Sequence, residues 1–527
     1  MILRWIFDEP SKIEHSRISM QLLKIYWLFL LFLAMGARAQ TTNDTNVLTR
    51  PISLEESIEL ALQHNLDVQI SRVNIDVARY NLSIAYADWD PSLSASATHS
   101  SSVNPSGLDP QGRPFPPTKS TSDSVAAGVG GPGVGASGLL PSGLTYSLSG
   151  NASDTVFQSG PNRIETSRGS LVLNMRQPLL RNSWIDTTRL NIKVDKNRLK
   201  YSELALRLQI MTVVNNVAQA YYELIFAREN IKVQQAALEL AERLVAENKK
   251  RVQVGTLAPL DEKQAESQAA ASRADLLTAQ ITFENQENVL KGLMTDDYTS
   301  LHSTLLDPTE VLAAPVPVVS LQDSWSEGMS QRPDLLQARL DVEKQNIQLR
   351  YTYNQLFPQL DLVGSYGYNG SATPGEFSTV FNQIGAGSFP TYSFGAVVTV
   401  PLGNRAARGN YQISKETKKQ FLLTLKSMEQ SILVQIDNAV KQVRNAFERT
   451  DATRQARAYA ETALDAEQKK LESGKSTSFQ VLQFQRDLTT ARSAEIRSLA
   501  DFNKALSQLY FLAGSILEKN HLKLEVK

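Results

Sequence analysis

The chain of 527 residues carries 54 basic and 54 acidic side chains, so its formal net charge is zero. Because the basic residues are spread along the chain, the sequence lacks the charge pattern of a nucleic-acid-binding protein. It contains no cysteine, which excludes disulfides, thiolate metal sites, a cysteine nucleophile and an amino-terminal lipid anchor.

The first segment predicts export from the cytoplasm. Lys24 precedes an apolar run from Ile25 to Met35, and small residues follow that run, as in a secretory signal peptide. We expect residues 1–39 to be this signal peptide, with Met20 as an alternative start; a buried core helix is the less favoured interpretation. The residues at the expected cleavage site are Ala37, Ala39 and Gln40.

Apart from the signal segment, the sequence has no continuous apolar stretch of the roughly 20 residues that a membrane helix needs. The mature chain is therefore expected to be either soluble outside the cytoplasm or to span a membrane as a β-barrel.

The mature chain contains an internal repeat. The segment from Ser53 to Leu93 aligns with Ser320 to Leu360 without a net gap, and this unit is too long for a solenoid repeat. We expect two copies of one structural unit, at 40–294 and 320–514, joined by an irregular equatorial linker at 295–319 and followed by a tail at 515–527. The identical pairs include Leu54/Leu321, Ser57/Ser324, Asp67/Asp334, Arg72/Arg339, Pro91/Pro358 and Leu93/Leu360.

Each copy is expected to begin with a helix that leads into strands. Ser53 and Glu56 have the spacing of a capping box, and helical periodicity continues to about Asp88. After Pro91, and after Pro358 in the second copy, the period changes to two, which predicts a strand pair in each copy. Residues 104–168, between the first pair, are rich in Gly, Pro and Ser and predict an inserted loop, within which 143–151 could add strand pairing.

A long helical hairpin is expected after each strand pair. In the first helical run, from about Ile185 to Arg251, every seventh position from Ile210 onward is apolar, as in a coiled coil. The second run extends from about Ala406 to Glu472. Each run would be roughly 100 Å long and therefore needs a packing partner. Gly255 and Gly474 interrupt the runs and predict the two hairpin tips, after which helices are expected at 259–293 and 478–513.

Catalytic chemistry is not indicated. The sequence lacks the H-E-x-x-H, G-x-S-x-G and P-loop motifs, and its histidines are scattered, so no enzyme activity, cofactor or metal site is expected. The five histidines are His15, His64, His99, His302 and His521.

The order of elements and three sets of motifs resemble the TolC family of outer-membrane efflux proteins from about Ser53 to Gly514. These motifs are the doubled opening (SLEESIELALQHNLDVQ and SLQDSWSEGMSQRPDLLQ), the strand exits (RQPLLRN and VPLGNRAARG) and the tips (RVQVGTLAPLDEKQAE and LESGKSTSFQVLQFQ). The resemblance implies a mixed α and β membrane protein that is a homotrimer. Each protomer would give four strands to a twelve-stranded transmembrane β-barrel, continued by a periplasmic α-helical coiled-coil barrel.

Two short strands in each copy cannot close a sheet, and an open sheet edge is not tolerated in lipid, so closure by other chains is expected independently of the resemblance. Four aromatic side chains are expected on the outer face of the barrel or in its interfacial aromatic girdle; packing inside a β-sandwich is the less favoured interpretation. The four residues are Tyr366, Tyr368, Tyr392 and Phe394.

The resemblance implies an exit duct of a tripartite efflux system, which conducts small molecules from a periplasmic adaptor and an inner-membrane transporter through the outer membrane. Two alternatives remain at this stage: an exit duct for type I protein secretion, and a soluble periplasmic helical adaptor or scaffold. The resemblance places adaptor docking at the tips, where glycine also serves the turn itself. The expected docking residues are Val254, Gly255, Thr256, Leu257, Ser473, Gly474, Lys475 and Ser476.

The resemblance also indicates a periplasmic constriction after the second tip. Gln480 and Gln483 align with two aspartates that form this constriction in the best-known family member. Two rings of amides would therefore replace two rings of carboxylates. Asp487, one helical turn further on, would restore some charge if it faces the lumen.

Overall fold

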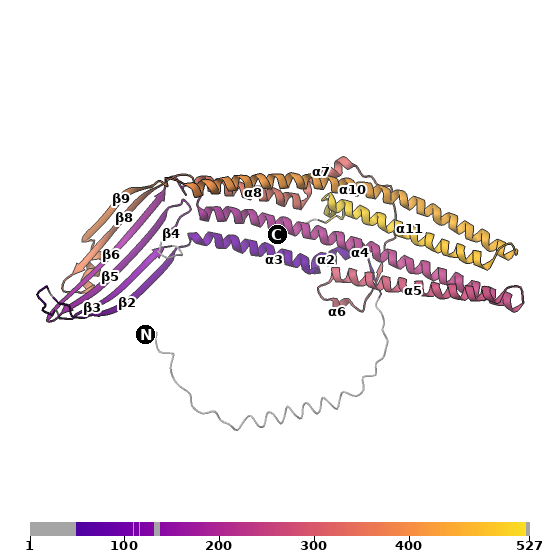
Figure 1. The fold of residues 1–527 in the computed structure, drawn as a ribbon, viewed down its shortest axis with the longest axis horizontal. Helices are drawn as coiled ribbons and strands as arrows, with labels where there is room; N and C mark the ends of the chain where they lie inside the picture. The colour runs from indigo at the N-terminus through magenta and orange to yellow at the C-terminus, as the bar shows by residue number, and fades with distance from the viewer. Residues whose placement is uncertain (1–48, 109, 115, 131–137, 523–527) are drawn as a thin grey trace, which may run out of the picture. The chain divides into compact units, whose positions relative to one another are not determined.

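The structure, a computed structural model, describes residues 49–108, 110–114, 116–130 and 138–522 (Figure 1). The expected signal peptide, Met20 and the cleavage residues Ala37, Ala39 and Gln40 lie outside this described part. By its internal contacts the chain divides into two units. The larger is Arg50–His302 with Leu306–Lys527, and the smaller includes, among the described residues, only Thr49 and 303–305.

One antiparallel sheet dominates the β structure of the larger unit. Its strands follow the order β2-β3-β5-β6-β8-β9, and a short strand, β4 (Gly138–Leu139), pairs with β5. The six long strands are β2 (Ser92–Asn104), β3 (Thr118–Gly130), β5 (Thr145–Ser159), β6 (Asn162–Pro178), β8 (Gln359–Ala372) and β9 (Phe389–Thr399).

The prediction of four strands per protomer with a loop at 104–168 was therefore wrong. Most of that segment forms β3, β5 and the start of β6, in continuous register with β2. β3 and β5 are rich in Ser, Thr, Gly and Ala, which are also common in turns and linkers. Their composition therefore did not indicate strands.

The two faces of the sheet differ in polarity. Paired residues share a face, and the register brings Leu148, Leu173, Tyr366 and Tyr392 into one line across four strands. The neighbouring line on the opposite face is Ser147, Asn174, Ser365 and Ser393. One face is thus apolar and the other polar, as in a sheet with lipid on one side and water on the other. The apolar face holds all four aromatic residues singled out from the sequence.

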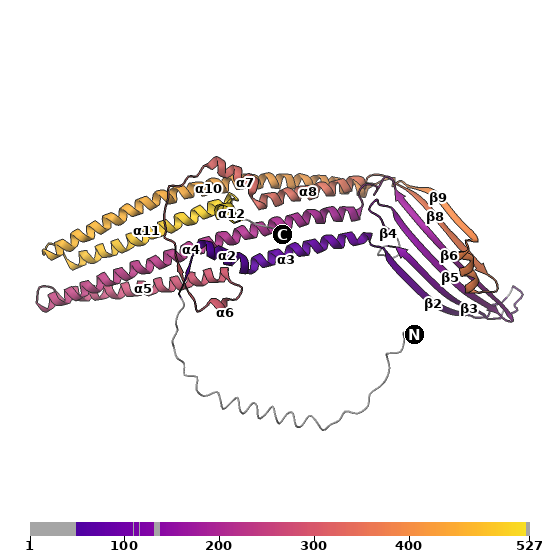
Figure 2. The ribbon, with the colours of Figure 1, turned by 180° about the vertical axis from the view of Figure 1, so that it is seen from behind.

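Four of the long strands continue into helices (Figures 1 and 2). The 3-10 turn η1 (Ala87–Trp89) connects α3 to β2, β6 leads to α4, α8 precedes β8, and β9 leads to α10. The helices concerned, with the second helix of each hairpin, are α3 (Leu66–Tyr86), α4 (Thr187–Gln253), α5 (Pro259–Met294), α8 (Pro333–Asn354), α10 (Arg405–Glu472) and α11 (Ser478–Leu512).

The two helical hairpins expected from the sequence are confirmed. The helices α4 and α5 pack along each other, as do α10 and α11, and α4 also packs against α11. At the heptad positions of α4, Ile210, Val217 and Leu224 are buried, whereas later members such as Val245 are half-buried. None of the helices in the described part of the chain is both long and apolar enough to cross a membrane.

Three boundaries differ from the expectation. The first helix is broken at Asn65, whose side chain caps the first turn of α3 directly after α2 (Leu54–His64). The second copy also breaks, between α7 (Leu321–Gln331) and α8, but there the break is at Arg332 without a side-chain cap, and Pro333 begins α8. The linker 295–319 contains α6 (Tyr298–Leu301) and β7 (Leu305–Pro308), which pairs with β1 (Thr49–Ile52). The tail includes α12 (Ile516–Lys519), whose first two residues are buried in the core.

Candidate functional site: the hairpin tips and the sheet

Both hairpin tips have the same backbone geometry. Gly255 and Gly474 adopt φ values of +75° and +74°, a left-handed conformation that favours glycine. Beyond each glycine, a backbone N–H bonds back to the helix: Thr256 to the carbonyl of Arg251 at 2.9 Å, and Lys475 to that of Lys470 at 2.8 Å. These bonds form the Schellman motif that ends many helices.

The tips are also exposed. Val254 is 73% exposed, and a Cβ built at either tip glycine would meet no atom within 4 Å. Of the eight expected docking residues, Leu257 and Ser476 are half-buried and the other six are exposed. The glycines therefore serve the turn, and the surface around them is open for contact with another protein.

The three residues expected at the constriction lie on one exposed face of α11. Gln480, Gln483 and Asp487 are all exposed, and their spacing of three and four residues aligns them along one side of a helix. The Nε2 atom of Gln483 donates a hydrogen bond to Oδ1 of Asp487 at 3.1 Å. Asp487 thus belongs to the same face as the two glutamines.

The face of α11 that carries Gln480 is connected to the tip by a polar chain. The hydroxyl of Ser476 bonds to Oε1 of Gln480 at 3.0 Å and to the carboxylate of Glu467. The Nζ atom of Lys470 lies 2.9 Å from the same carboxylate. Hydrogen bonds from Ser476 and Lys470 hold the pKa of Glu467 below its ordinary value, so this carboxylate is charged at neutral pH.

Polar contacts also join the two hairpins. Near the tips, Asn248 of α4 accepts from the Ser478 hydroxyl at 3.1 Å. Further along, the carboxylate of Glu223 in α4 accepts two hydrogen bonds from α11, one from Nη1 of Arg497 at 2.6 Å and one from Nζ of Lys504 at 2.7 Å. Burial alone would raise the pKa of Glu223, but the bonds from Lys504 and Arg497 outweigh burial and lower it.

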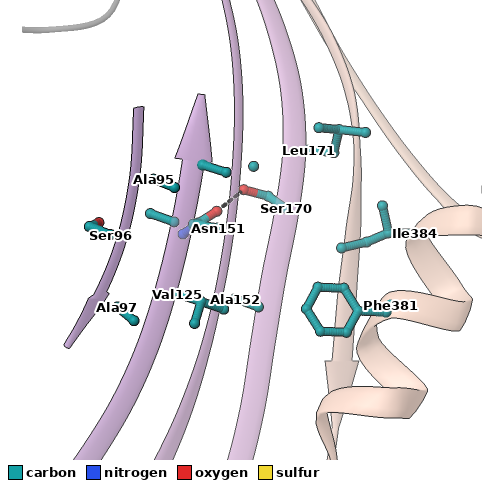
Figure 3. Close-up of a pocket in the computed structure, with 13 residues that line it drawn as sticks. Ala95, Ser96, Ala97, Val125, Asn151, Ala152, Ser170, Leu171, Phe381 and Ile384 are labelled. Carbon is teal, nitrogen blue, oxygen red and sulfur yellow. Dashed lines mark hydrogen bonds between the residues drawn. The ribbon is translucent and has the colours of Figure 1, made fainter. Parts of the chain in front are cut away.

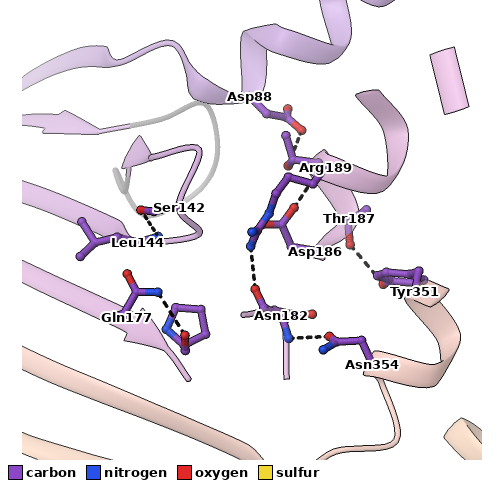
Figure 4. A network of polar contacts seen from close by, with 12 residues as sticks. Asp88, Ser142, Leu144, Gln177, Asn182, Asp186, Thr187, Arg189, Tyr351 and Asn354 are labelled. Carbon is purple, nitrogen blue, oxygen red and sulfur yellow. Dashed lines mark hydrogen bonds and ion pairs between the residues drawn. The ribbon is translucent and has the colours of Figure 1, made fainter. Parts of the chain in front are cut away.

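At the junction of sheet and helices, a second polar network fixes the exit of β6 (Figure 4). Asp186 caps α4 and also pairs with Arg189, whose Nη2 donates to the Asn182 carbonyl at 2.8 Å. The backbone N–H of Asn182 donates to Asn354 of α8 at 2.7 Å. Asn182 has φ of +64°, and Asn404, at the exit of β9, has +41°. The two strand-exit motifs therefore each contain a left-handed asparagine, a role that the sequence alone did not indicate.

The apolar face of the sheet carries a short helix, α9 (Phe377–Gly385). Val380 is fully buried against Gly169 and Gly370, where added Cβ atoms would lie 2.7 Å and 2.6 Å from atoms of Val380. Beside this helix is an open cleft of about 640 Å³ lined by small residues of the sheet, Phe381 and Ile384 (Figure 3). Glycine thus allows the helix to lie directly on the strands.

The described residues contain no group of three or more His, Asp or Glu side chains placed to hold a metal ion. The histidines that are described lie on separate elements: His64 ends α2, His99 is in β2, and His302 and His521 follow α6 and α12. Their positions do not converge on a catalytic site.

This chain combines a sheet that has one apolar and one polar face with long helical hairpins that continue it. This combination is characteristic of the subunits of outer-membrane channels. Residues 125–295 and 326–515 match the family described as outer membrane efflux protein, and the chain belongs to that family.

Known relatives agree with this assignment. The chain is 25% identical over 394 residues to the outer membrane protein TolC of Vibrio cholerae, which covers 73% of this chain and 84% of that protein. Its fold is similar to the outer membrane channel CmeC of Campylobacter jejuni, with a TM-score of 0.64, 16% identity and 90% of each chain covered. It is also similar to VceC of Vibrio cholerae, with a TM-score of 0.63, 19% identity and coverage of 88% of this chain and 96% of that one.

Family membership establishes the broad function. The protein is an outer-membrane exit duct for an efflux system, with its helical part in the periplasm, and its family acts as a conduit and not as an enzyme. The soluble adaptor, weighed as an alternative, is thereby excluded.

Proposed function

We propose that three copies of this chain assemble into the duct, that a periplasmic adaptor protein bound to an inner-membrane transporter docks at the helical tips, and that the cargo is small molecules. The observation that carries this proposal is the pair of matching exposed tips, which present a rigid turn with an open surface on each hairpin. The apolar face of the sheet would contact outer-membrane lipid.

The sheet supports assembly with other copies. Within the described chain, β2 and β9 each pair on one side only. Unpaired strand edges are not tolerated in hydrocarbon, and joining β2 of one copy to β9 of the next closes the sheet under cyclic symmetry. Native mass spectrometry of the detergent-extracted protein tests this: we expect a trimer, and a monomer that conducts ions in bilayers would overturn it.

Substitution of the two tip glycines by a bulky residue tests the docking proposal. Gly255→Trp combined with Gly474→Trp should abolish efflux while trimer mass and membrane insertion stay unchanged. The matched control is the pair Gly255→Asn and Gly474→Asn, because asparagine tolerates the left-handed conformation and adds less bulk. We expect the control to retain most efflux. Normal transport by the tryptophan variant would rule out docking at the tips.

Type I protein secretion remains the second candidate for the cargo. Affinity purification of the intact duct after cross-linking in cells distinguishes the two, because the transporter that is recovered with it defines the cargo class. Recovery of an ATP-driven polypeptide exporter in place of a small-molecule pump would replace the efflux proposal.

A further inference from the structure

The sheet contains two more strands per chain than the family resemblance implies, and we propose that these strands, β3 and β5, form part of the membrane-spanning wall. This inference rests on the proposed function, since it takes the sheet to be the wall of a trimeric duct. Three copies of six strands would close an eighteen-stranded pore in place of a twelve-stranded one.

In their halves nearer the helices, the side chains of β3 and β5 alternate as in a membrane strand; nearer the β5–β6 turn, Asp123 pairs with Asp154 on the same face as Ala127 and Leu148 and marks the edge of the apolar band. On the apolar face β5 presents Leu148, and β3 presents Ala127, which pairs with Gly150 two residues further along β5. On the opposite face β5 presents Ser147 and β3 presents Ser122, whose hydroxyl lies 3.4 Å from that of Thr155. A β-hairpin exposed to water on both sides is not expected to have an apolar face.

The length and register of the two strands also fit the wall. β3 has 13 residues and β5 has 15, and a tilted strand of about 9–11 residues crosses the hydrocarbon core. Pairing runs without interruption from Asn104 through Thr118 and Ser159 to Asn162 at one end of the strands. The inserted pair thus continues the plane of the sheet and does not branch from it.

The described residues just before β5 lie against the helical part of the unit. Gly143, in the turn before β5, lies so close to α4 that a Cβ there would be 2.5 Å from Nη2 of Arg189. The same arginine holds the exit of β6 through Asn182. The start of β5 therefore lies at the level where the neighbouring strands become helices.

The helices leave room for the two extra strands. Six strands spaced roughly 4.8 Å apart and tilted by about 40° occupy roughly 38 Å of circumference. The four helices that meet the sheet, packed roughly 8–10 Å apart, occupy roughly 32–40 Å. The six-stranded wall therefore matches the helical wall below it in width.

The consequence concerns which cargo the duct admits. Barrel diameter grows roughly in proportion to strand number, so eighteen strands give a pore about 1.5-fold wider than twelve. The polar face, rich in Ser and Thr, would line this wider exit. Size selection would then rest with the helical end, and bulky polar solutes that pass the helices would leave the barrel unhindered.

The absence of cysteine from the chain allows a direct test by single-cysteine labelling of the intact trimer in outer membranes. Each strand receives one substitution on each face, and a charged, water-soluble methanethiosulfonate is the probe. The variants are Ala126→Cys and Ala127→Cys in β3, Ser147→Cys and Leu148→Cys in β5, and Asn174→Cys and Leu173→Cys in the reference strand β6.

We expect the polar-face cysteines at 126, 147 and 174 to react about tenfold faster than their neighbours at 127, 148 and 173, because only the polar face meets water. A lipid-soluble maleimide should label the apolar-face set. If both faces of β3 and β5 react equally while β6 keeps its alternation, the proposal that β3 and β5 belong to the membrane wall is overturned, but the proposal that the sheet is that wall is not. Loss of alternation in β6 as well would overturn the proposal that this sheet is the membrane wall.

A deletion provides the second test. Asn104 and Asn162 lie at the same level of the sheet, so replacing residues 105–161 by a short glycine turn brings β2 directly against β6 with the faces in phase. We expect the deleted trimer to insert and to exclude smaller polyethylene glycols, added from the extracellular side, than the full-length trimer excludes. An unchanged exclusion limit in a folded trimer would contradict an eighteen-stranded pore.

Discussion

The side chain of Asn248, buried in α4, accepts a hydrogen bond from Ser478 at the first turn of α11 and donates one to the carbonyl of Asp261 in α5. One amide therefore joins three helices, and it ties the first hairpin to the second close to both tips. Since a buried polar group is costly to leave unpaired, this contact stabilises the relative position of the hairpins.

Asn248→Ala should loosen the beginning of α11. Loss of both hydrogen bonds is expected to lower the local opening free energy by about 1–2 kcal/mol, which corresponds to exchange about tenfold faster. Hydrogen exchange measured by mass spectrometry on peptides covering 478–488 is the readout. Thr490→Ala, an exposed position on the same helix, is the control. Unchanged exchange in the Asn248 variant would show that the contact contributes little.

We propose that the face of α11 with Gln480 and Gln483 lines the periplasmic constriction, which should then respond weakly to multivalent cations. Gln480 and Gln483 lack the charge and hard oxygen ligands of carboxylates, and Asp487 is hydrogen-bonded to Gln483. Single-channel recording should show little block of the wild type by micromolar trivalent cation from the periplasmic side. Gln480→Asp with Gln483→Asp should introduce strong block. Strong block of the wild type that does not change in the double variant would defeat this hypothesis.

Glu223 should make stability depend on pH. Its pKa is lowered in the folded protein, so its contribution is fully present above the unfolded value of about 4.3 and is lost as pH falls through the lower, folded value. Glu223→Gln should therefore reduce thermal stability at pH 7, because Arg497 and Lys504 lose their partner, and the difference from wild type should shrink toward pH 3.

The control for this prediction is Glu239→Gln, which removes an exposed pair with Arg243 and is expected to cost no more than about 0.5 kcal/mol. Melting followed by circular dichroism on the detergent-extracted protein gives both comparisons. A difference for Glu223→Gln that stays constant from pH 7 to pH 3 would show that the carboxylate charge is not responsible.

The mature protein should begin at Gln40. Ala37 and Ala39 provide the small residues that signal peptidase recognises. Amino-terminal sequencing of protein extracted from the outer membrane measures this directly, and Ala39→Tyr should impair cleavage and leave a larger precursor. A mature start upstream of Met35 would contradict the signal-peptide interpretation.

The helical part could be predicted from the sequence because the patterns that indicate it are local and repeated. A heptad of apolar residues specifies a paired helix, and a glycine within such a pattern marks the tip, as Gly255 and Gly474 do. The break at Asn65 was missed since asparagine is common both within helices and at their ends, and only its hydrogen bonds to Asp67 and Val68 identify it as a cap.

The sheet was harder to predict. A strand with lipid on one side and water on the other can be made largely of Ala alternating with Ser. Large apolar residues are therefore few in β3 and β5, and they do not form the regular alternation that usually indicates a strand. The candidate site was predicted only as a set of positions. That Asp487 shares a face with Gln483 follows from their spacing of four residues, whereas the contact between Asn248 and Ser478 depends on the rotation of α11 against α4, which only the packed structure provides.

Among the described residues, the outer edges of β2 and β9 are unpaired, and this has a genetic consequence. Under the proposed three-fold assembly, one copy with a damaged edge leaves a seam that its two sound neighbours cannot seal. When equal amounts of normal and damaged chain are made in one cell and mix at random, only about one ring in eight consists of normal copies alone. A defect in either edge strand should therefore be dominant, whereas a defect confined to one chain's tip is expected to be milder.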